Sequence, residues 1–261
     1  MKQPDIYESN RRAWNAEAEA GNFWTVPVSQ REIDDAREGK PFVRVTPFKS
    51  VPPGWISGLK GKRVLCACGG GGQQTPLLSA YGCLTTALDI SDAQTESDRL
   101  TLRKYGLEAD LVRANVLEMP FSDHCFDAVI MPQAMNFIDD ISRLYREISR
   151  VLVLGGTFIF GVANPVLYIF DEKVQTRRLK VKYTLPFSHG KALSGRQLKA
   201  RLERNDTLEF SHTLDSILGG LVSSGFIIDG FFSDSAGSEP TDSFIFDSHL
   251  AVKAVLAKPL K

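Results

Sequence analysis

The sequence predicts an α/β fold in which helices cover both faces of a doubly wound, mostly parallel sheet. Short apolar runs alternate with helical patterns over residues 62–163, as expected for successive strand–helix–strand units. The first apolar run leads into a glycine tract, Gly69–Gly72, directly before a helical pattern, and the second ends at an acidic residue, Asp89. Ligands of such sheets bind at the carboxyl ends of the strands, so both features lie where a site is expected.

Residues 1–55 lack this alternation and are predicted to form a helical arm or cap. A helix is predicted over 6–20 and a second over 29–37, where Ser29 and Glu32 have the spacing of a capping box. The proline-rich segment 46–53 is expected to be extended and to join the arm to the core.

The sheet domain is expected over 56–261. Runs of apolar residues predict its strands, and apolar residues three or four positions apart predict its helices. In chain order the predicted strands are 63–67, 84–88, 109–114, 126–131, 157–163, 226–232 and 249–256, and the predicted helices are 73–81, 93–105, 139–151 and 214–224. Ser91 is expected to cap the second of these helices, and Gly155-Gly156 to stop the third.

Residues 164–211 interrupt the alternation and are predicted to form a cap inserted after the fifth strand. They contain prolines, glycines and a basic run over 173–182, and a strand pair is expected around 179–185. The basic run could favour an acidic substrate, although such runs more often form a solvated face. The polar stretch 233–243 is predicted as a loop.

Charge and hydropathy argue against several classes of function. The chain has 31 basic and 31 acidic residues, so its charge gives no reason to expect binding to nucleic acid or to a membrane surface. The first residues lack the apolar core of a secretory signal, and no apolar run reaches the roughly 18 residues of a membrane span. We therefore expect a cytoplasmic protein with a small-molecule substrate, whose oligomeric state the sequence does not indicate.

The four cysteines, Cys66, Cys68, Cys83 and Cys125, are predicted to be reduced thiols. Cys66 and Cys68 alternate along one predicted strand, so their side chains should point to opposite faces, which disfavours a disulfide or a shared metal ion. No second pair stands at zinc-site spacing, so no metal is expected.

The glycine tract predicts a turn that approaches a ligand closely, because a Cβ atom would obstruct such an approach. A tightly packed loop without a ligand explains the same glycines equally well. Asp89 favours the ligand, because a carboxylate at the end of the second strand can accept hydrogen bonds from both hydroxyls of a ribose. A cap for the next helix is the other role open to Asp89, and Ser91 already fills it.

Asn115 and Val116 follow the third strand, where the edge of an adenine would lie, and an asparagine amide can both donate to and accept from that edge. To this point the pattern fits any cofactor that contains adenosine, NAD included. An NAD enzyme does not account for the stretch from Met119 to Asp127 or for the two closing strands.

Together these pieces resemble the class I S-adenosylmethionine-dependent methyltransferases of the small-molecule group. The matching segments are VLCACGGGG, ALDIS, RANVLEMPFSDHCFD and EISRVLVLGGTF, over about residues 62–163. The chain is still more similar to a bacterial subfamily with a GGGQQ first motif, with further matches at Pro52-Pro53-Gly54-Trp55, Asn164-Pro165 and His212-Thr213-Leu214. The resemblance implies a Rossmann-like sheet of seven strands, the last antiparallel, and S-adenosyl-L-methionine as cofactor.

The resemblance also implies which residues contact the cofactor. They are Ala67, Cys68, Gly69, Gly70, Gln73, Gln74, Asp89, Ile90, Gln94, Asn115, Val116, Pro132 and Gln133. Two positions depart from the family pattern: Cys66 stands where an acid is common, and Cys68 where the first motif glycine is common.

The implied reaction is in-line transfer of the sulfonium methyl group, which depends mostly on alignment and on exclusion of water. A general base is needed only where the nucleophile loses a proton. His212 and Tyr168 are the candidates, with His189 and Asp171 nearby in or beside the cap. A structural role for His212, at the start of a helix, is an equally good interpretation.

Substrate contacts are expected from Trp14, Trp24, Asn136 and Asn164. The two tryptophans could close over an apolar acceptor, or they could only anchor the arm to the core. Two other functions stay open on the sequence: an NAD-dependent oxidoreductase, and a protein that binds S-adenosylmethionine without catalysis.

Overall fold

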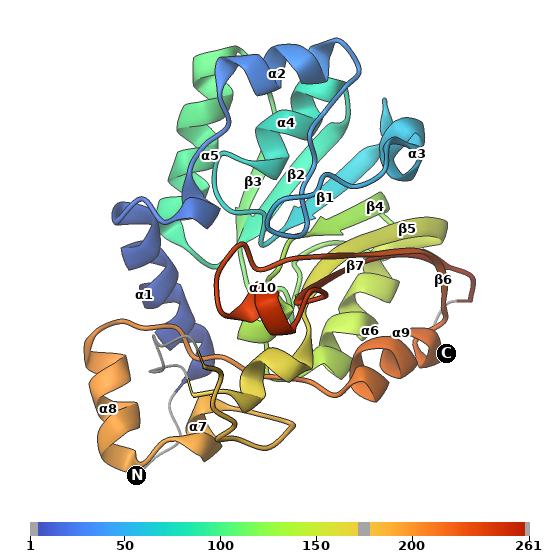
Figure 1. Cartoon of the computed structure of the whole chain (residues 1–261). Coiled ribbons are helices and arrows are strands. Elements are labelled where there is room, and N and C mark those ends of the chain that lie inside the picture. The colour runs from blue at the N-terminus through green and yellow to red at the C-terminus, as the bar shows by residue number, and fades with distance from the viewer. Residues whose placement is uncertain (1–4, 172–177, 259–261) are drawn as a thin grey trace.

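The computed structural model describes residues 5–171 and 178–258. It contains a seven-stranded sheet in the order β3-β2-β1-β4-β5-β7-β6 (Figure 1). The strands are β1 (Arg63–Ala67), β2 (Leu84–Asp89), β3 (Asp110–Arg113), β4 (Phe126–Met131), β5 (Leu152–Ala163), β6 (Phe226–Asp234) and β7 (His249–Leu256). Strands β1 to β5 pair in parallel, and β7 is antiparallel to both β5 and β6. The predicted fold is confirmed.

Each face of the sheet carries its own apolar core, because successive side chains of a strand point to opposite faces. In β1, Leu65 and Ala67 pack into one cluster and Val64 and Cys66 into the other. The first cluster lies under α6 (Ile141–Val151) and α9 (Gly220–Ser223), and the second under α4 (Gln74–Tyr81).

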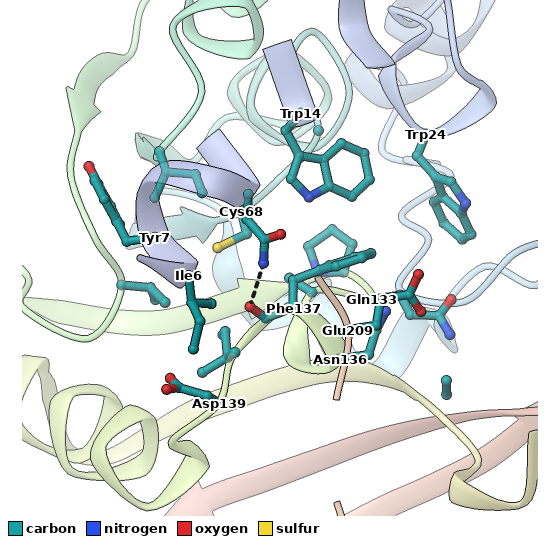
Figure 2. Close-up of a pocket in the computed structure, with 18 of the residues that line it drawn as sticks. Ile6, Tyr7, Trp14, Trp24, Cys68, Gln133, Asn136, Phe137, Asp139 and Glu209 are labelled. Carbon is teal, nitrogen blue, oxygen red and sulfur yellow. Dashed lines mark hydrogen bonds between the residues drawn. The ribbon is translucent and has the colours of Figure 1, made fainter. Parts of the chain in front are cut away.

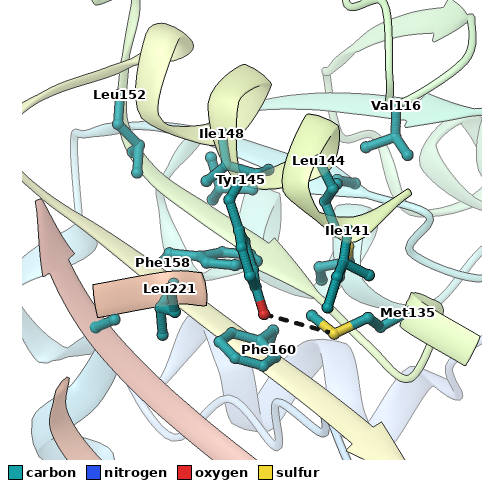
Figure 3. Packing of buried hydrophobic residues seen from close by; sticks show 14 of the residues in the cluster. Val116, Met135, Ile141, Leu144, Tyr145, Ile148, Leu152, Phe158, Phe160 and Leu221 are labelled. Atoms are coloured by element: carbon teal, nitrogen blue, oxygen red, sulfur yellow. Dashed lines mark hydrogen bonds between the residues drawn. The ribbon is translucent and has the colours of Figure 1, made fainter. Parts of the chain in front are cut away.

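Figure 3 shows the first cluster, in which the side chains of α6 pack onto β5. The rings of Phe158 and Phe160 stack with their centroids 4.6 Å apart. Tyr145 is fully buried among them, and its hydroxyl donates to the carbonyl of Ile217 at 2.8 Å. This bond fastens the closing helical segment to α6 and satisfies a buried polar group.

The N-terminal arm consists of α1 (Ile6–Glu19), a turn η1 (Phe23–Thr25) and α2 (Gln30–Arg37). Ser29 and Glu32 form the predicted capping box at the start of α2. Helix α1 lies against α5 (Asp92–Tyr105) and extends toward the cap (Figure 1). Short helical turns α3 (Pro53–Ile56) and η2 (Ser57–Leu59) lead into β1.

The cap contains η4 (Pro165–Ile169), α7 (His189–Ala192) and α8 (Gly195–Glu203). The strand pair expected around 179–185 is wrong, because the described residues there form one isolated bridge, Val181 with Phe170. Apolar and polar residues do alternate over 179–185, but Val181 and Leu185 are exposed, so the alternation buries no face of a hairpin. Of the basic run, residues 173–177 lie outside the described residues.

Three further boundaries differ from the prediction. Helix α6 ends at Val151 and β5 begins at Leu152, so Gly155-Gly156 lies inside a strand instead of stopping a helix. Gly155 has φ +80°, and the pairing of β4 with β5 is irregular there, so the glycine serves a strand irregularity. The helix predicted over 214–224 divides into a π-helical turn η5 (Asp215–Gly219) and α9, and α10 (Thr241–Phe244) occupies part of the predicted loop.

No helix among residues 5–171 and 178–258 combines the length and the hydropathy that a membrane crossing requires.

Candidate active site

A pocket of about 670 Å³ opens at the carboxyl ends of β1, β2 and β4 (Figure 2). One part, which we call the glycine half, is lined by residues of three segments: 68–70 with Gln73, 89–90 with Gln94, and 115–117. The other part, the cap half, is lined by the arm, by the turn η3 (Met135–Phe137) after β4 and by the cap. The two halves are continuous, so two ligands could meet inside the pocket.

Most of the cofactor residues expected from the sequence line the pocket. They are Cys68, Gly69, Gly70, Gln73, Asp89, Ile90, Gln94, Asn115, Val116, Pro132 and Gln133. Ala67 and Gln74 do not, since Ala67 packs into the core and the Gln74 amide donates to the carbonyl of Arg44 at 2.8 Å. The structure therefore gathers side chains from four separate motifs around one cavity.

The glycines after β1 are required first by packing within the protein. A Cβ added to Gly71 would lie 2.1 Å from the carbonyl oxygen of Gln94, and one added to Gly70 would lie 2.5 Å from that of Trp24. Gly70 and Gly72 also have positive φ values, +63° and +80°, which L residues rarely adopt. The turn is thus wedged between the arm and α5, while part of its surface still faces the pocket.

Both glutamines of the GGGQQ segment fasten the arm to this turn. The Gln73 amide donates to the carbonyl of Val26 at 2.9 Å and to that of Phe23 at 3.3 Å. The N–H of Val28 donates to the carbonyl of Gly72 at 2.8 Å. Because these bonds hold the segment that includes Trp24, they fix one wall of the pocket.

Asp89 ends β2 with its carboxylate in the glycine half. One oxygen accepts the N–H of Ser91 at 2.9 Å, and Ser91 caps α5 as predicted. Burial raises the pKa of Asp89 to about 6, although backbone N–H donors act in the opposite direction. The carboxylate keeps acceptor capacity for ligand hydroxyls.

Asp98 lies beneath the glycine turn, where it accepts the N–H of Gly72 at 2.7 Å. Its burial raises its pKa to about 7, and the nearby charge of Asp89 adds to that effect. Burial also raises the pKa of the Cys68 thiol, which lines the pocket. Cys68 is therefore a neutral wall and not a thiolate.

Of the expected substrate residues, Trp14, Trp24 and Asn136 line the pocket. The Trp14 ring meets Phe137 edge to face, with centroids 5.0 Å apart. Asn164 does not line the pocket: it caps η4 by accepting the N–H of Val166 at 3.1 Å and donates to the carbonyl of Asp247. Asn164 directly follows β5 and precedes η4, so its amide serves as the N-terminal cap of that turn and is held by these two hydrogen bonds.

The two candidate bases are placed differently. Tyr168 lines the pocket, and its hydroxyl donates to Glu209 Oε2 at 2.8 Å. His212 lies outside the lining, with Nε2 2.9 Å from the carbonyl oxygen of Ile138, and burial lowers its pKa. The Nε2–H of His212 thus holds the turn after β4, which is the structural alternative foreseen for it.

The other two candidates also have structural contacts. His189 is buried, and its Nδ1 accepts the N–H of Glu209 at 2.9 Å. Asp171 pairs with Lys182 at 3.1 Å and does not line the pocket.

Two residues that the sequence did not single out organise the cap half. Asn10 is buried in α1, donates to the carbonyls of Phe137 and Leu208 at 3.0 Å, and accepts the N–H of Leu208 at 2.7 Å. Glu209 is the residue after Leu208, and it lines the pocket. A buried asparagine on an amphipathic helix is a sequence signal that could have been found, whereas Glu209 stands in a stretch without any pattern.

Comparison with known proteins agrees with the resemblance. Residues 65–160 match the family model described as a methyltransferase domain. The chain is 37% identical to an uncharacterized methyltransferase, YbaJ, of Bacillus subtilis, over 92% of this chain and 93% of that protein. It is 34% identical to sarcosine/dimethylglycine N-methyltransferase of Halorhodospira halochloris, over 38% of this chain and 40% of that protein.

Among solved structures, geranyl diphosphate C-methyltransferase of Streptomyces coelicolor, in complex with S-adenosyl-L-homocysteine, has a similar fold. The TM-score is 0.60 with 15% identity, over 98% of this chain and 99% of that one. The likeness extends over both the arm and the cap.

Proposed function

The chain belongs to the class I S-adenosylmethionine-dependent methyltransferases, and we propose that the acceptor of its methyl group is a small molecule bound in the cap half of the pocket. The arm, over residues 1–55, and the cap, over 164–211, would enclose that molecule. Assignment to the narrower GGGQQ subfamily stays a prediction.

The observation that carries the proposal is the continuity of the pocket from Asp89 to the cap. We infer that Asp89 would bind the ribose hydroxyls of S-adenosylmethionine and that Asn115 and Val116 would meet its adenine. The sulfonium would then face the cap half. An acceptor between Trp14 and Tyr168 would lie in line with the methyl group.

The residues of the cap half suit a reaction that depends on alignment. Trp14 and Phe137 provide a fixed apolar wall, and the hydrogen bonds of Asn10 join that wall to the segment that carries Glu209. Bound between them, an acceptor would lose its hydration and keep one orientation, which is how enzymes accelerate transfer from an already reactive donor.

A small acceptor is supported by the dimensions of the site and by the relatives. A pocket of about 670 Å³ has the size of sites for small molecules with their cofactors. Two of the similar proteins are named for small acceptors, sarcosine or dimethylglycine and geranyl diphosphate. A nucleic acid strand would need a basic surface, and the chain carries no net charge.

Calorimetry with S-adenosylmethionine, S-adenosylhomocysteine and NAD tests the cofactor assignment. We expect both sulfur compounds to bind and NAD not to bind. Formation of S-adenosylhomocysteine with a panel of small acceptors then separates an enzyme from a protein that only binds the cofactor. Binding of NAD alone, or cofactor binding without turnover on any acceptor, would contradict the proposal.

A further inference from the structure

Two hydrogen-bond acceptors that line the pocket after β4, at residues 133 and 136, are left unsatisfied by the described part of the protein. The resemblance implied a cofactor contact for the first of them, Gln133. Gln133 Oε1 and Asn136 Oδ1 are buried and have no hydrogen-bond partner among the described residues. Asn136 is only 8% exposed, and both residues line the pocket (Figure 2). Leaving a buried acceptor without a donor is costly. Three other buried oxygens, on Thr46, Gln74 and Thr85, also have no partner in the described parts of the chain. Only Gln133 and Asn136 line the pocket, where a ligand could bring N–H or O–H groups.

Glu209 adds a carboxylate beside these amides. The N–H of its neighbour Phe210 donates to the backbone carbonyl of Asn136 at 2.7 Å, so the two segments run side by side. Glu209 Oε2 accepts from Tyr168 at 2.8 Å, and Oε1 accepts from Thr207 at 3.2 Å. A carboxylate offers about four lone-pair positions, so Glu209 can accept further donors from a ligand.

The charges around the pocket favour a cation. Among the described lining residues the acidic ones are Asp5, Asp89, Asp139 and Glu209, and the basic ones are Arg201 and His249. Burial lowers the pKa of His249, which favours the neutral imidazole. Arg201 already donates to the carbonyl of Thr207 at 2.7 Å and lies 3.6 Å from Glu209 Oε1. The described residues of the basic run, Arg178, Lys180 and Lys182, do not line the pocket. An anionic acceptor would thus meet an excess of negative charge.

Aromatic rings form much of the remaining wall of the cap half, from Tyr7 and Trp14 on the arm to Phe170 and Phe187 on the cap. Such walls favour an apolar or aromatic body, and ring faces also attract cations.

We propose that the acceptor molecule is an organic amine, bound as a cation, and that Glu209, Asn136 and Gln133 receive its N–H groups. An ammonium group offers three donors, whereas a hydroxyl offers one. For methyl transfer to this nitrogen the ammonium would first lose one proton to the Glu209 carboxylate, because a protonated nitrogen has no lone pair. The new bond from nitrogen to the methyl carbon would form as the bond from that carbon to the sulfonium sulfur breaks, with S-adenosylhomocysteine as the leaving group. This inference rests on the proposed function, because it requires the cofactor to occupy the glycine half. Glu209 is then the residue that sets specificity for charge.

The test compares three probes of matched shape on protein saturated with S-adenosylhomocysteine: phenethylamine, 3-phenylpropionate and 2-phenylethanol. Calorimetry or ligand-observed NMR gives their affinities. We expect the amine to bind at least about tenfold more tightly than the acid, which corresponds to about 1.4 kcal/mol, and the alcohol to lie between them. E209Q should reduce the preference for the amine to less than about threefold.

The matched control is E203Q, which removes the same charge at the exposed end of α8, outside the pocket, and should leave the preference unchanged. Affinity for S-adenosylhomocysteine is measured first, because it tests the proposed function separately from the amine assignment. If S-adenosylhomocysteine does not bind, the cofactor assignment fails. If the cofactor product binds but the acid binds as tightly as the amine, or E209Q keeps the preference, only the amine assignment is overturned. If E209Q does not fold, the comparison of probes on the native protein still decides.

Discussion

Replacement of Asp89 by asparagine is the sharpest single perturbation of the glycine half. Asparagine has the same shape and keeps an oxygen for the N–H of Ser91, which Asp89 accepts at 2.9 Å, but it removes the charge. A hydrogen bond to a charged acceptor contributes about 1.5–3 kcal/mol and a neutral one about 0.5–1.5. With two ribose hydroxyls, Asp89→Asn should cost about 2–3 kcal/mol of binding, so the Kd for S-adenosylhomocysteine should rise about 30- to 150-fold.

The pH dependence of binding gives this prediction a second, independent signature. Burial raises the pKa of Asp89 to about 6, so the carboxylate that binds ribose is lost as the pH falls through that value. Affinity of the native protein should therefore be constant above roughly pH 7 and fall about tenfold per unit below pH 6. Asp89→Asn should remove this dependence.

As the pH rises, the affinity for the ligand should increase, whereas the stability of the ligand-free protein should decrease. A carboxyl whose folded pKa lies above its unfolded value holds its proton more tightly when folded, so its contribution is present at low pH and lost as the pH rises. A shift from 3.8 to about 6 corresponds to about 3 kcal/mol against the ionised form. At alkaline pH, Asp89→Asn should thus raise the free energy of unfolding by up to about 3 kcal/mol.

Calorimetric titration across roughly pH 5 to 8, together with urea unfolding of both proteins, measures all three effects. The ligand assignment for Asp89 would be refuted if Asp89→Asn bound S-adenosylhomocysteine with native affinity at alkaline pH. If the affinity of the native protein did not depend on pH, the raised pKa of Asp89 would be contradicted.

Three further predictions follow from single contacts. Gly71→Ala should lower the free energy of unfolding by at least about 2 kcal/mol, because its Cβ would lie 2.1 Å from the Gln94 carbonyl oxygen. Gly69→Ala, whose Cβ has its closest contact at 3.6 Å, should change that free energy little. Equal effects of the two variants in urea unfolding would show that the turn is not tightly packed against α5. Asn136→Leu should stabilise the ligand-free protein by about 1–3 kcal/mol, because it removes a buried oxygen without a donor, and should abolish binding of phenethylamine; a lower Tm would mean that the amide has a partner in solution. Gln73→Leu removes both donors to the carbonyls of Phe23 and Val26 and should speed amide hydrogen exchange over 22–28 by about tenfold or more, with unchanged exchange there as the contrary result.

The sheet could be predicted from the sequence because its signals are local. In β1 every second residue faces the same core cluster, and the caps at Ser29 and Ser91 stand at the positions their spacing indicates. Gly155 misled because a glycine marks a positive φ in any element, and here it serves β5 instead of ending α6. In the cap, the apolar alternation over 179–185 misled, because Val181 and Leu185 are exposed and do not pack on a core.

The site was predictable only where it coincides with strand ends. Asp89 ends β2 and Asn115 comes just after β3, so the order of the strands brings both residues to the same edge of the sheet. Asn10 could have been singled out as an amide on an amphipathic helix, but its partner Leu208 lies 198 positions away, and no local pattern indicates that contact. Glu209 follows Leu208 in a stretch without any pattern, so local reasoning could not indicate it. For the glycines the sequence left a close ligand and tight packing equally open, and packing against Trp24 and Gln94 by itself requires Gly70 and Gly71.

A crystal structure of the protein with S-adenosylhomocysteine tests the central claim most directly. We predict density for the ligand in the glycine half, with both ribose hydroxyls on the Asp89 carboxylate, the adenine beside Asn115 and the sulfur facing Asn136 and Glu209. Density for the ligand elsewhere on the protein, or a sulfur that faces away from the cap half, would contradict the account.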